Sequence, residues 1–302
     1  MSAELIDGNA VSEKMKTELK AEIEKLASEK ITPSLSAVQV GENPASRVYI
    51  RKQKETCENL GIAYTLHELD ADTDQQGVVD YIHKLNRDDS VSGIILQMPL
   101  PEGVDSRTVQ QEISPAKDVE GIHPSNLGKL FSGTATVAPC TAMGAVSLLK
   151  STGVDLKGKE VVIVGHSEIV GKPILMMMLE SLAASPTPTC CHIATKDLAF
   201  HTGRADILFV ACGVPGLIKG EMIKEGAIVI DIGINRVDMR DENGEPVLSE
   251  KTGKPRKKTV GDVEFDAACE RASMITPVPG GVGPMTVTML LRNTVECAKL
   301  NQ

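Results

Sequence analysis

Three small residues, Gly165, Ser167 and Gly171, have the spacing that points most directly to chemistry. They follow the run from Val161 to Val164, which is typical of a strand buried on both faces. Gly165 permits a sharp turn, Ser167 could cap a following helix, and free N–H groups at a helix start bind phosphate. The stretch predicts a dinucleotide site. An ordinary strand–turn–helix remains equally open, because the middle glycine of G-x-G-x-x-G is missing.

Two other segments have backbones built for close contact. Residues 97–101 contain two prolines, which forbid helix and require a fixed extended segment. Residues 277–286 are dense in glycine and proline ahead of an apolar helix. Such a loop exposes its backbone to a group that approaches closely, although a rigid turn would have the same composition.

The elements that must position these segments alternate between strand and helix, which predicts a parallel sheet with crossover helices. We expect an α/β fold with two domains: a parallel-sheet domain over residues 1–148 plus a C-terminal helix at 285–302, and a Rossmann-like domain over residues 149–284. A polar excursion after residue 235 predicts a hairpin. The expected strands are residues 3–8, 33–40, 62–68, 91–96, 161–164, 189–192, 207–210, 228–231 and 274–275. The expected helices are residues 10–28, 45–60, 75–87, 104–113, 142–151 and the C-terminal helix.

Composition narrows the class of protein. The chain has 302 residues, of which 41% are hydrophobic and 24% charged, as in a globular protein with ample core. A net charge of -9 and only 2% aromatic residues argue against nucleic-acid binding. No apolar run reaches transmembrane length, and seven scattered cysteines without a leader suggest free thiols in the cytoplasm. His123 and His201 lack partners at metal-ligand spacing, so we expect no metal site.

Six motifs then coincide in order and spacing, and together they resemble the methylenetetrahydrofolate dehydrogenase/cyclohydrolase family over nearly the whole chain. The motifs are Asn43-Pro44-Ala45-Ser46 with Tyr49, and the segments at 97–101, 117–121, 165–173, 231–235 and 279–286.

The resemblance implies a two-domain enzyme, usually a homodimer, that binds tetrahydrofolate substrates in a cleft between its domains. Its dehydrogenase passes hydride from 5,10-methylenetetrahydrofolate to NAD or NADP, and its cyclohydrolase hydrolyses the methenyl product to 10-formyltetrahydrofolate. The hydride step depends mainly on placement of the two reactants.

The resemblance also implies the site residues. Catalytic candidates are Tyr49, Lys52, Gln53, Gln97 and Glu120. Candidates for binding the folate are Tyr49, Gln53, Leu96, Gln97, Met98, Pro99, Glu120, Pro279, Gly280, Gly281, Val282, Gly283 and Thr286. Candidates for binding the cofactor are Gly165, His166, Ser167, Ile169, Val170, Gly171, Ile193, Thr195, Ile234 and Asn235.

Position 53 departs from the family pattern. Cyclohydrolysis moves protons and calls for a positioned acid or base. The family places a lysine four residues after the tyrosine, where this chain has Gln53. Glutamine forms hydrogen bonds but cannot shuttle a proton near neutral pH. We therefore expect a competent dehydrogenase with weak or absent cyclohydrolase, unless Lys52 or a bound water substitutes.

Three further departures concern the two ligands. Glu120 stands where the family usually has aspartate; its carboxylate can still accept two hydrogen bonds from a pterin. NADP-using members commonly carry arginine at His166 and serine at Ile193, and neither replacement favours a 2′-phosphate. No acidic residue ends the strand at 189–192 to hold a ribose diol, and Lys196 or His192 could still meet a phosphate. The balance favours NAD, with NADP left open.

Two other classes of protein fit part of the pattern. One is a dehydrogenase acting on amino or hydroxy acids, against which Tyr49 and the 279–286 loop argue. The other is a non-catalytic folate- or nucleotide-binding homologue, which the missing lysine makes conceivable.

Overall fold

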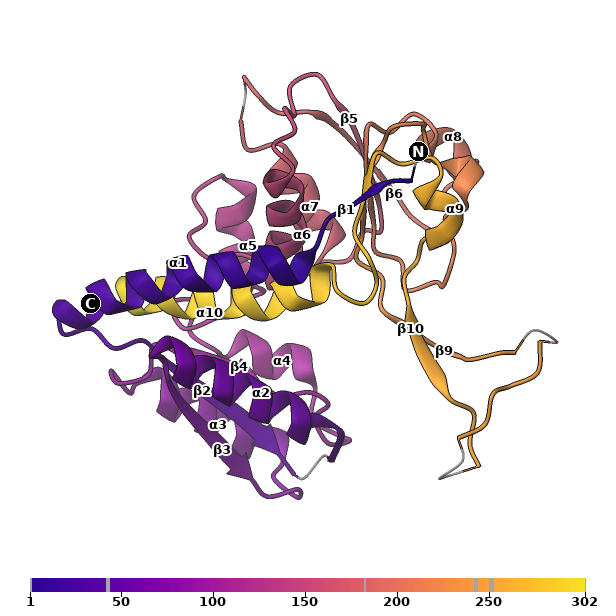
Figure 1. Cartoon of the computed structure of the whole chain (residues 1–302). Coiled ribbons are helices and arrows are strands. Elements are labelled where there is room, and N and C mark those ends of the chain that lie inside the picture. The colour runs from indigo at the N-terminus through magenta and orange to yellow at the C-terminus, as the bar shows by residue number, and fades with distance from the viewer. Residues whose placement is uncertain (1, 42–43, 182, 242–243, 250–252, 302) are drawn as a thin grey trace. The chain divides into compact units, whose positions relative to one another are not determined.

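The computed structural model describes residues 2–41, 44–181, 183–241, 244–249 and 253–301, with the backbone alone for residues 44–49. It consists of two compact units, formed by residues 12–140 with 286–302 and by residues 1–11 with 141–285 (Figure 1). We call them the three-stranded unit and the six-stranded unit after their sheets.

The three-stranded unit contains a parallel sheet in the order β3-β2-β4. Its apolar side chains interleave with those of α3 to form the core. The helices α1 and α10 lie side by side, and Ser12 and Thr288 share a buried hydrogen bond of 2.8 Å between their hydroxyls (Figure 1). The elements are α1 (Gly8–Ser28), β2 (Ser34–Val40), α2 (Pro44–Leu60), β3 (Ala63–Leu69), α3 (Gln75–Asn86), β4 (Gly93–Leu96), α4 (Ser106–Gln111), α5 (Pro124–Phe131) and α10 (Val282–Leu300).

The six-stranded unit contains a fully parallel sheet in the order β1-β11-β8-β7-β5-β6. If the strands are numbered along the chain from β5, then β6, β5, β7, β8 and β11 lie side by side in the order 2-1-3-4-5, as in doubly wound folds. The elements are β1 (Glu4–Leu5), α6 (Cys140–Ser151), β5 (Glu160–Val164), α7 (Gly171–Met178), β6 (Thr187–Cys191), α8 (Leu198–Thr202), β7 (Ile207–Val210), the 3₁₀ turn η1 (Gly220–Met222), β8 (Ile228–Asp231), β9 (Asn235–Asp238), β10 (Lys257–Val260), α9 (Phe265–Cys269) and β11 (Met274–Ile275).

The expected α/β architecture is confirmed, but the compact units divide the chain differently from the expected domains. The first eleven residues belong with the six-stranded unit, because β1 pairs in parallel with β11 and Glu4 lies opposite Met274. The last helix begins at Val282, earlier than the expected residue 285. Pairing between residues so far apart in the chain leaves no local signal in the sequence.

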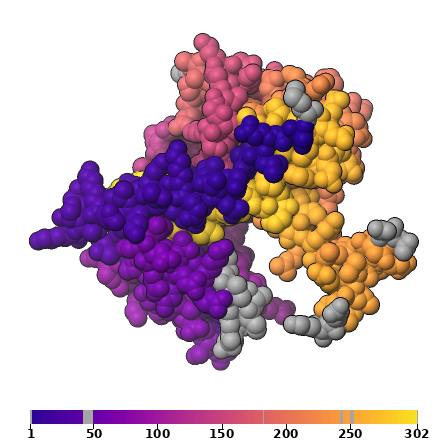
Figure 2. Space-filling view, viewed as in Figure 1, coloured from indigo at the N-terminus to yellow at the C-terminus, as the bar shows by residue number. Residues whose placement is uncertain are grey.

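The structure also adds one helix and confirms the expected hairpin. Helix α5 was not expected at all. The hairpin is present as antiparallel β9 and β10, and Figure 2 shows its orange atoms projecting from the six-stranded unit; parts of the polar excursion between these strands lie outside the described residues. Among the residues with a described placement, no helix is both long and apolar enough to cross a membrane.

Candidate active site

The turn after β5 is built by close backbone packing. Val161 to Val164 are fully buried, and Gly165 follows with φ +134°. A Cβ on Gly165 would lie 2.3 Å from the carbonyl oxygen of Ala211, and one on Gly171 would lie 1.9 Å from that of Gly165. Both positions therefore require glycine, and the expected close approach of the helix is confirmed.

Ser167 does not cap this helix. Its Oγ accepts a hydrogen bond from the N–H of Val170 at 3.1 Å, and α7 begins only at Gly171, where Val170 is the N-cap without a side-chain bond. Two glycines let the backbone fold back on itself before the helix starts. The expectation of a serine cap was wrong because this extra turn occupies residues 166–170.

The carboxyl ends of the central strands carry exposed apolar side chains. One follows each of four neighbouring strands, in the order β6, β5, β7, β8: Ile193 (65% exposed), Ile169 (52%), Val214 (37%) and Ile234 (66%). The chain crosses from β6 over β5 to β7, so the switch point of the sheet lies between β5 and β7. Ligands of doubly wound sheets bind at that point, outside the carboxyl ends of the strands. Three of these four residues were expected at the cofactor; Val214 was missed because it stands in no recognised motif.

Two histidines meet at this edge. The rings of His166 and His192 lie with centroids 4.7 Å apart and tilted by 40°. The Nδ1 atom of His192 accepts a hydrogen bond from the N–H of Ala194 at 3.2 Å, so the ring proton of its neutral form is on Nε2. Thr195 closes the same turn by accepting from the N–H of His192. His166, His192 and Ile193 thus present imidazole and aliphatic groups at the carboxyl ends of β5 and β6.

In the three-stranded unit, Gln53 and Gln97 are brought together as expected. The Oε1 atom of Gln53 accepts from Gln97 Nε2 at 3.0 Å and from the hydroxyl of Tyr64 at 3.1 Å. Gln53 is 1% exposed, and its Nε2 has no hydrogen-bond partner within the described part of the chain. Tyr64 was missed by sequence reasoning, since it reaches Gln53 from a different element, β3. This centre holds carboxamides and a phenol, none of which transfers a proton readily near neutral pH.

Lys52 is exposed, although it neighbours the buried Gln53 on α2. Adjacent helical residues are rotated away from one another around the axis, so the two side chains leave the helix in different directions. The side chain of Tyr49 lies outside the described residues, and its expected role stays a prediction.

Glu120 follows a buried carboxylate. Asp118 is fully buried and accepts hydrogen bonds from Gly121 N, His123 N and Asn126 Nδ2 at 2.8 to 3.1 Å. Burial, and after it the nearby Asp118, raises the pKa of Glu120 to about 7. The parallel bridge between Ile94 and Asp118 places Glu120 at the same edge of the sheet as the carboxyl end of β4.

The remaining expected folate residues differ in exposure. Leu96 is 3% exposed and packs in the core, so its side chain cannot take part in binding without unpacking it. Met98, by contrast, is 53% exposed and Pro99 is also exposed. Residues 279–283 follow β11 in the six-stranded unit, where Pro279 and Gly283 are exposed and Gly281 and Val282 are buried. Thr286 is the first residue of the C-terminal segment that belongs to the three-stranded unit.

A pair of carboxylates at the ends of β8 and β10 was also missed. Asp231 accepts from the N–H groups of Gly233, Asp262 and Val263 at 3.0 to 3.1 Å. Asp262 in turn accepts from Cys212 N, Gly213 N and Asn235 Nδ2. Burial raises the pKa of Asp231 to about 7, against the effect of its backbone donors.

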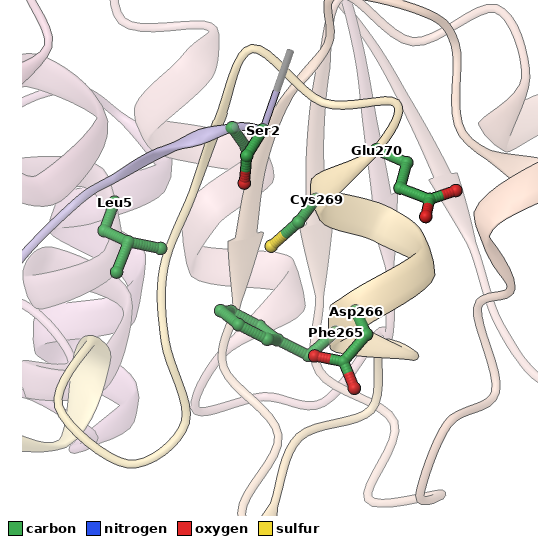
Figure 3. Close-up of a pocket in the computed structure, with 7 residues that line it drawn as sticks. Ser2, Leu5, Phe265, Asp266, Cys269 and Glu270 are labelled. Carbon is green, nitrogen blue, oxygen red and sulfur yellow. The ribbon is translucent and has the colours of Figure 1, made fainter.

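A shallow pocket lies elsewhere on the six-stranded unit, between the N-terminal strand and α9 (Figure 3). Leu5, Phe265 and Cys269 supply its apolar lining. Ser2 precedes β1 and Cys269 precedes β11, so the pocket lies toward the amino ends of these parallel strands. It is therefore separate from the carboxyl-end site.

Comparisons with known proteins agree with this geometry. Residues 6–120 match the family described as tetrahydrofolate dehydrogenase/cyclohydrolase, catalytic domain, and residues 139–302 match its NAD(P)-binding domain. The bifunctional protein FolD of Geotalea uraniireducens is 50% identical over 297 residues, which cover 98% of this chain and 99% of that protein.

Two solved structures have the same fold over their whole length. The bifunctional FolD methylenetetrahydrofolate dehydrogenase/cyclohydrolase of Campylobacter jejuni is 42% identical with a TM-score of 0.88, covering 100% of both chains. The Trypanosoma brucei dehydrogenase-cyclohydrolase, complexed with NADP and an inhibitor, is 35% identical with a TM-score of 0.86, covering 99% of this chain and 98% of that chain. The chain belongs to the tetrahydrofolate dehydrogenase/cyclohydrolase family.

Proposed function

We propose that this chain oxidises 5,10-methylenetetrahydrofolate with NAD and hydrolyses the methenyl product only weakly. The observation that carries the proposal is the chemistry at position 53. A carboxamide is buried there, it accepts two hydrogen bonds, and its immediate partners are a second carboxamide and a phenol. Hydride transfer needs mainly the placement of two ligands, so it does not depend on a proton carrier at position 53. Hydrolysis needs a proton carrier, which these three side chains do not supply at neutral pH.

The dehydrogenase is tested by absorbance of methenyltetrahydrofolate, formed only when the folate substrate and the nicotinamide are both present. Hydrolysis is tested by its decay, compared with the spontaneous rate. We expect decay close to spontaneous, and a gain on the order of 100-fold in Gln53→Lys, the lower range for a positioned acid or base. Lys54→Met is the matched control, because Lys54 is an exposed lysine of the same helix paired with Glu58. Robust hydrolysis by the unaltered chain would refute the weak cyclohydrolase.

A fully bifunctional enzyme is the second candidate, and the names of the relatives favour it. In that case Lys52 or a bound water replaces the missing lysine. Lys52→Met separates these routes, since it abolishes hydrolysis only if Lys52 carries the proton. A folate-binding homologue without catalysis predicts no absorbance change with either cofactor.

The choice of NAD rests on the carboxyl ends of β5 and β6. His166 and His192 pack against each other, and Ile193 is exposed beside them without a hydrogen-bonding group in its side chain. A 2′-phosphate is best held by arginine, whereas these three side chains include no guanidinium, and the isoleucine offers no donor. Values of kcat/KM measured with both cofactors test this, and a large preference for NADP would reverse it.

We also propose a homodimer, as the family resemblance implies. Sedimentation equilibrium gives the mass directly. A single species at the mass of one chain would contradict the proposed homodimer.

A further inference from the structure

Asp262 is a fully buried carboxylate on which three donors converge. Its Oδ2 accepts from the backbone N–H groups of Cys212 at 2.5 Å and Gly213 at 2.8 Å, and its Oδ1 accepts from Asn235 Nδ2 at 2.8 Å. Cys212 and Gly213 follow β7, and Asn235 follows β8. One side chain therefore ties together the loops that leave two neighbouring strands.

This contact fixes the orientation of the Asn235 amide. An asparagine has a donor end and an acceptor end, which can exchange places by a half turn. A carboxylate can only accept, so it selects the orientation in which Asn235 turns Nδ2 inward. The Oδ1 of Asn235 is then the atom left for a ligand, and no donor to it occurs among the described residues.

The arrangement is built into the chain rather than accidental. A Cβ on Gly233 would lie 2.3 Å from the Oδ1 of Asp262, and one on Gly261 would lie 1.8 Å from the Oδ2 of Asp231. Both carboxylates thus occupy space that only glycine leaves free. The backbone N–H of Asp262 is itself held by Asp231 at 3.1 Å.

Asn235 stands on the nicotinamide side of the cofactor site. In doubly wound sheets the adenosine lies over the first two strands, here β5 and β6, and the other half of the dinucleotide extends across the switch point. That half passes over the carboxyl ends of β7 and β8. The neighbouring Ile234 is 66% exposed at the same edge.

We propose that Asp262 is a positioning residue, which makes Asn235 present an acceptor oxygen to a hydrogen-bond donor on the nicotinamide half of the cofactor. The donor is the carboxamide NH2 or a ribose hydroxyl. The inference rests on the proposed dehydrogenase, because it requires a bound nicotinamide dinucleotide.

The first test is the dissociation constant for NAD, measured by calorimetry on the full chain, with thermal melting as the check of folding. In Asp262→Asn, the amide of Asn235 turns over to match the new NH2 and presents a donor outward. We expect binding about 5- to 20-fold weaker, the loss of about one hydrogen bond. Asp206→Asn is the matched control, since Asp206 also accepts from a backbone N–H but lies at the amino end of β5. Its dissociation constant should not change.

Recovery of NAD binding in a double variant distinguishes a positioning role of Asp262 from a role in stability alone. Asn235→Asp alone places a second carboxylate against Asp262 and should weaken NAD binding. The double variant Asn235→Asp with Asp262→Asn restores the hydrogen bond between the two side chains and leaves an acceptor oxygen facing outward. We expect the double variant to bind within about threefold of the unaltered chain. Asn235→Ala removes the oxygen itself and reports on the same contact if Asp262→Asn fails to fold.

The acetylpyridine analogue of NAD, which lacks the carboxamide NH2, identifies the donor. If that group is the donor, the unaltered chain binds the analogue more weakly and Asp262→Asn binds both equally. If a ribose hydroxyl is the donor, Asp262→Asn loses the same factor for both. Unchanged NAD binding in Asp262→Asn or Asn235→Ala, or a double variant without rescue, would overturn the proposal. A chain that binds neither NAD nor NADP would instead remove the dehydrogenase itself.

Discussion

At the scale of single residues, each unit contains an amide side chain that is hydrogen-bonded at one end and, among the described residues, left without such a bond at the other. Gln53 has its oxygen occupied by Tyr64 and Gln97, which leaves the amide nitrogen. Asn235 has its nitrogen occupied by Asp262, which leaves the oxygen. Only the second orientation is anchored by a group that cannot donate, so only there does the structure dictate which atom faces a ligand.

Glu120 should make folate binding depend on pH. Burial and Asp118 raise its pKa to about 7, above the ordinary range of glutamate. In its expected role the ionised form accepts two hydrogen bonds from the pterin, so we expect folate to bind more weakly wherever the carboxyl is protonated. The dissociation constant of the folate substrate should therefore fall as pH rises from about 5.5 to 7 and level off above that value.

Glu120→Gln is the control for this dependence, since an amide does not titrate in that range. It should bind more weakly at pH 8 and show a flat profile. A wild-type profile that is flat across pH 7, or one that slopes equally in Glu120→Gln, would assign the dependence to another group.

At the scale of elements, the junction between β5 and α7 tolerates no side chain at Gly165 or Gly171. In Gly171→Ala the new Cβ would lie 1.9 Å from the carbonyl oxygen of Gly165, so the turn must open. We expect a loss of about 1 to 3 kcal/mol in the free energy of unfolding, as for overpacked cores, together with weaker NAD binding. Urea titration measures the first and calorimetry the second.

Gly128→Ala is the matched substitution, because Gly128 also lies in a helix, α5, and its Cβ would meet open space. It should be stabilising by up to about 1 kcal/mol. Equal changes in stability at Gly171 and Gly128 would show that the close contact at Gly171 does not decide the result.

A buried amide helps to hold helix α10 within the three-stranded unit. The Nδ2 of the fully buried Asn293 donates to the carbonyl oxygens of Val119 and Ala138 at 2.8 and 2.9 Å. Asn293→Ala leaves both carbonyls buried without this donor and should cost about 1 to 3 kcal/mol of unfolding free energy. Asn301 also donates to two backbone carbonyls, but it is exposed, so Asn301→Ala should be nearly neutral in the same denaturation. Comparable losses in the two variants would contradict the role of burial.

The sequence predicted elements best where one apolar run is bounded by turn residues. The strands β7, β8 and β11 have the expected bounds, and β5 differs by one residue. Helix α5 escaped notice because Pro124 and Asn126 read as loop, although His123 caps it through Nδ1. The motif residues Gln53 and Gln97 were predicted and do meet. Tyr64 and Asp262 were not, because their roles depend on contacts between distant segments that no local pattern encodes.

At the scale of the whole molecule, the chain crosses between its units at residues 11, 140 and 285. A chain that starts at Gly8 lacks β1 and should therefore weaken the six-stranded unit, not the unit that contains α1. It loses the backbone bonds from Glu4 to Ser273 and from Ile6 to Ile275. Hydrogen exchange should show faster exchange in β11 and β8 with protection kept in β2 and β4. Equal loss in both sheets would show that the units unfold together.

Because each unit is built from segments that are far apart in the chain, the order of synthesis constrains when each unit can fold. The strand β1 emerges from the ribosome first, yet β11, with which it pairs, is made some 270 residues later, at Met274. The three-stranded unit likewise waits for α10, whose buried Asn293 completes the bonds to residues 119 and 138. The six-stranded unit cannot complete its sheet until β11 has been translated, and the three-stranded unit lacks a helix until α10 follows, so the nascent chain must hold two unfinished units at once.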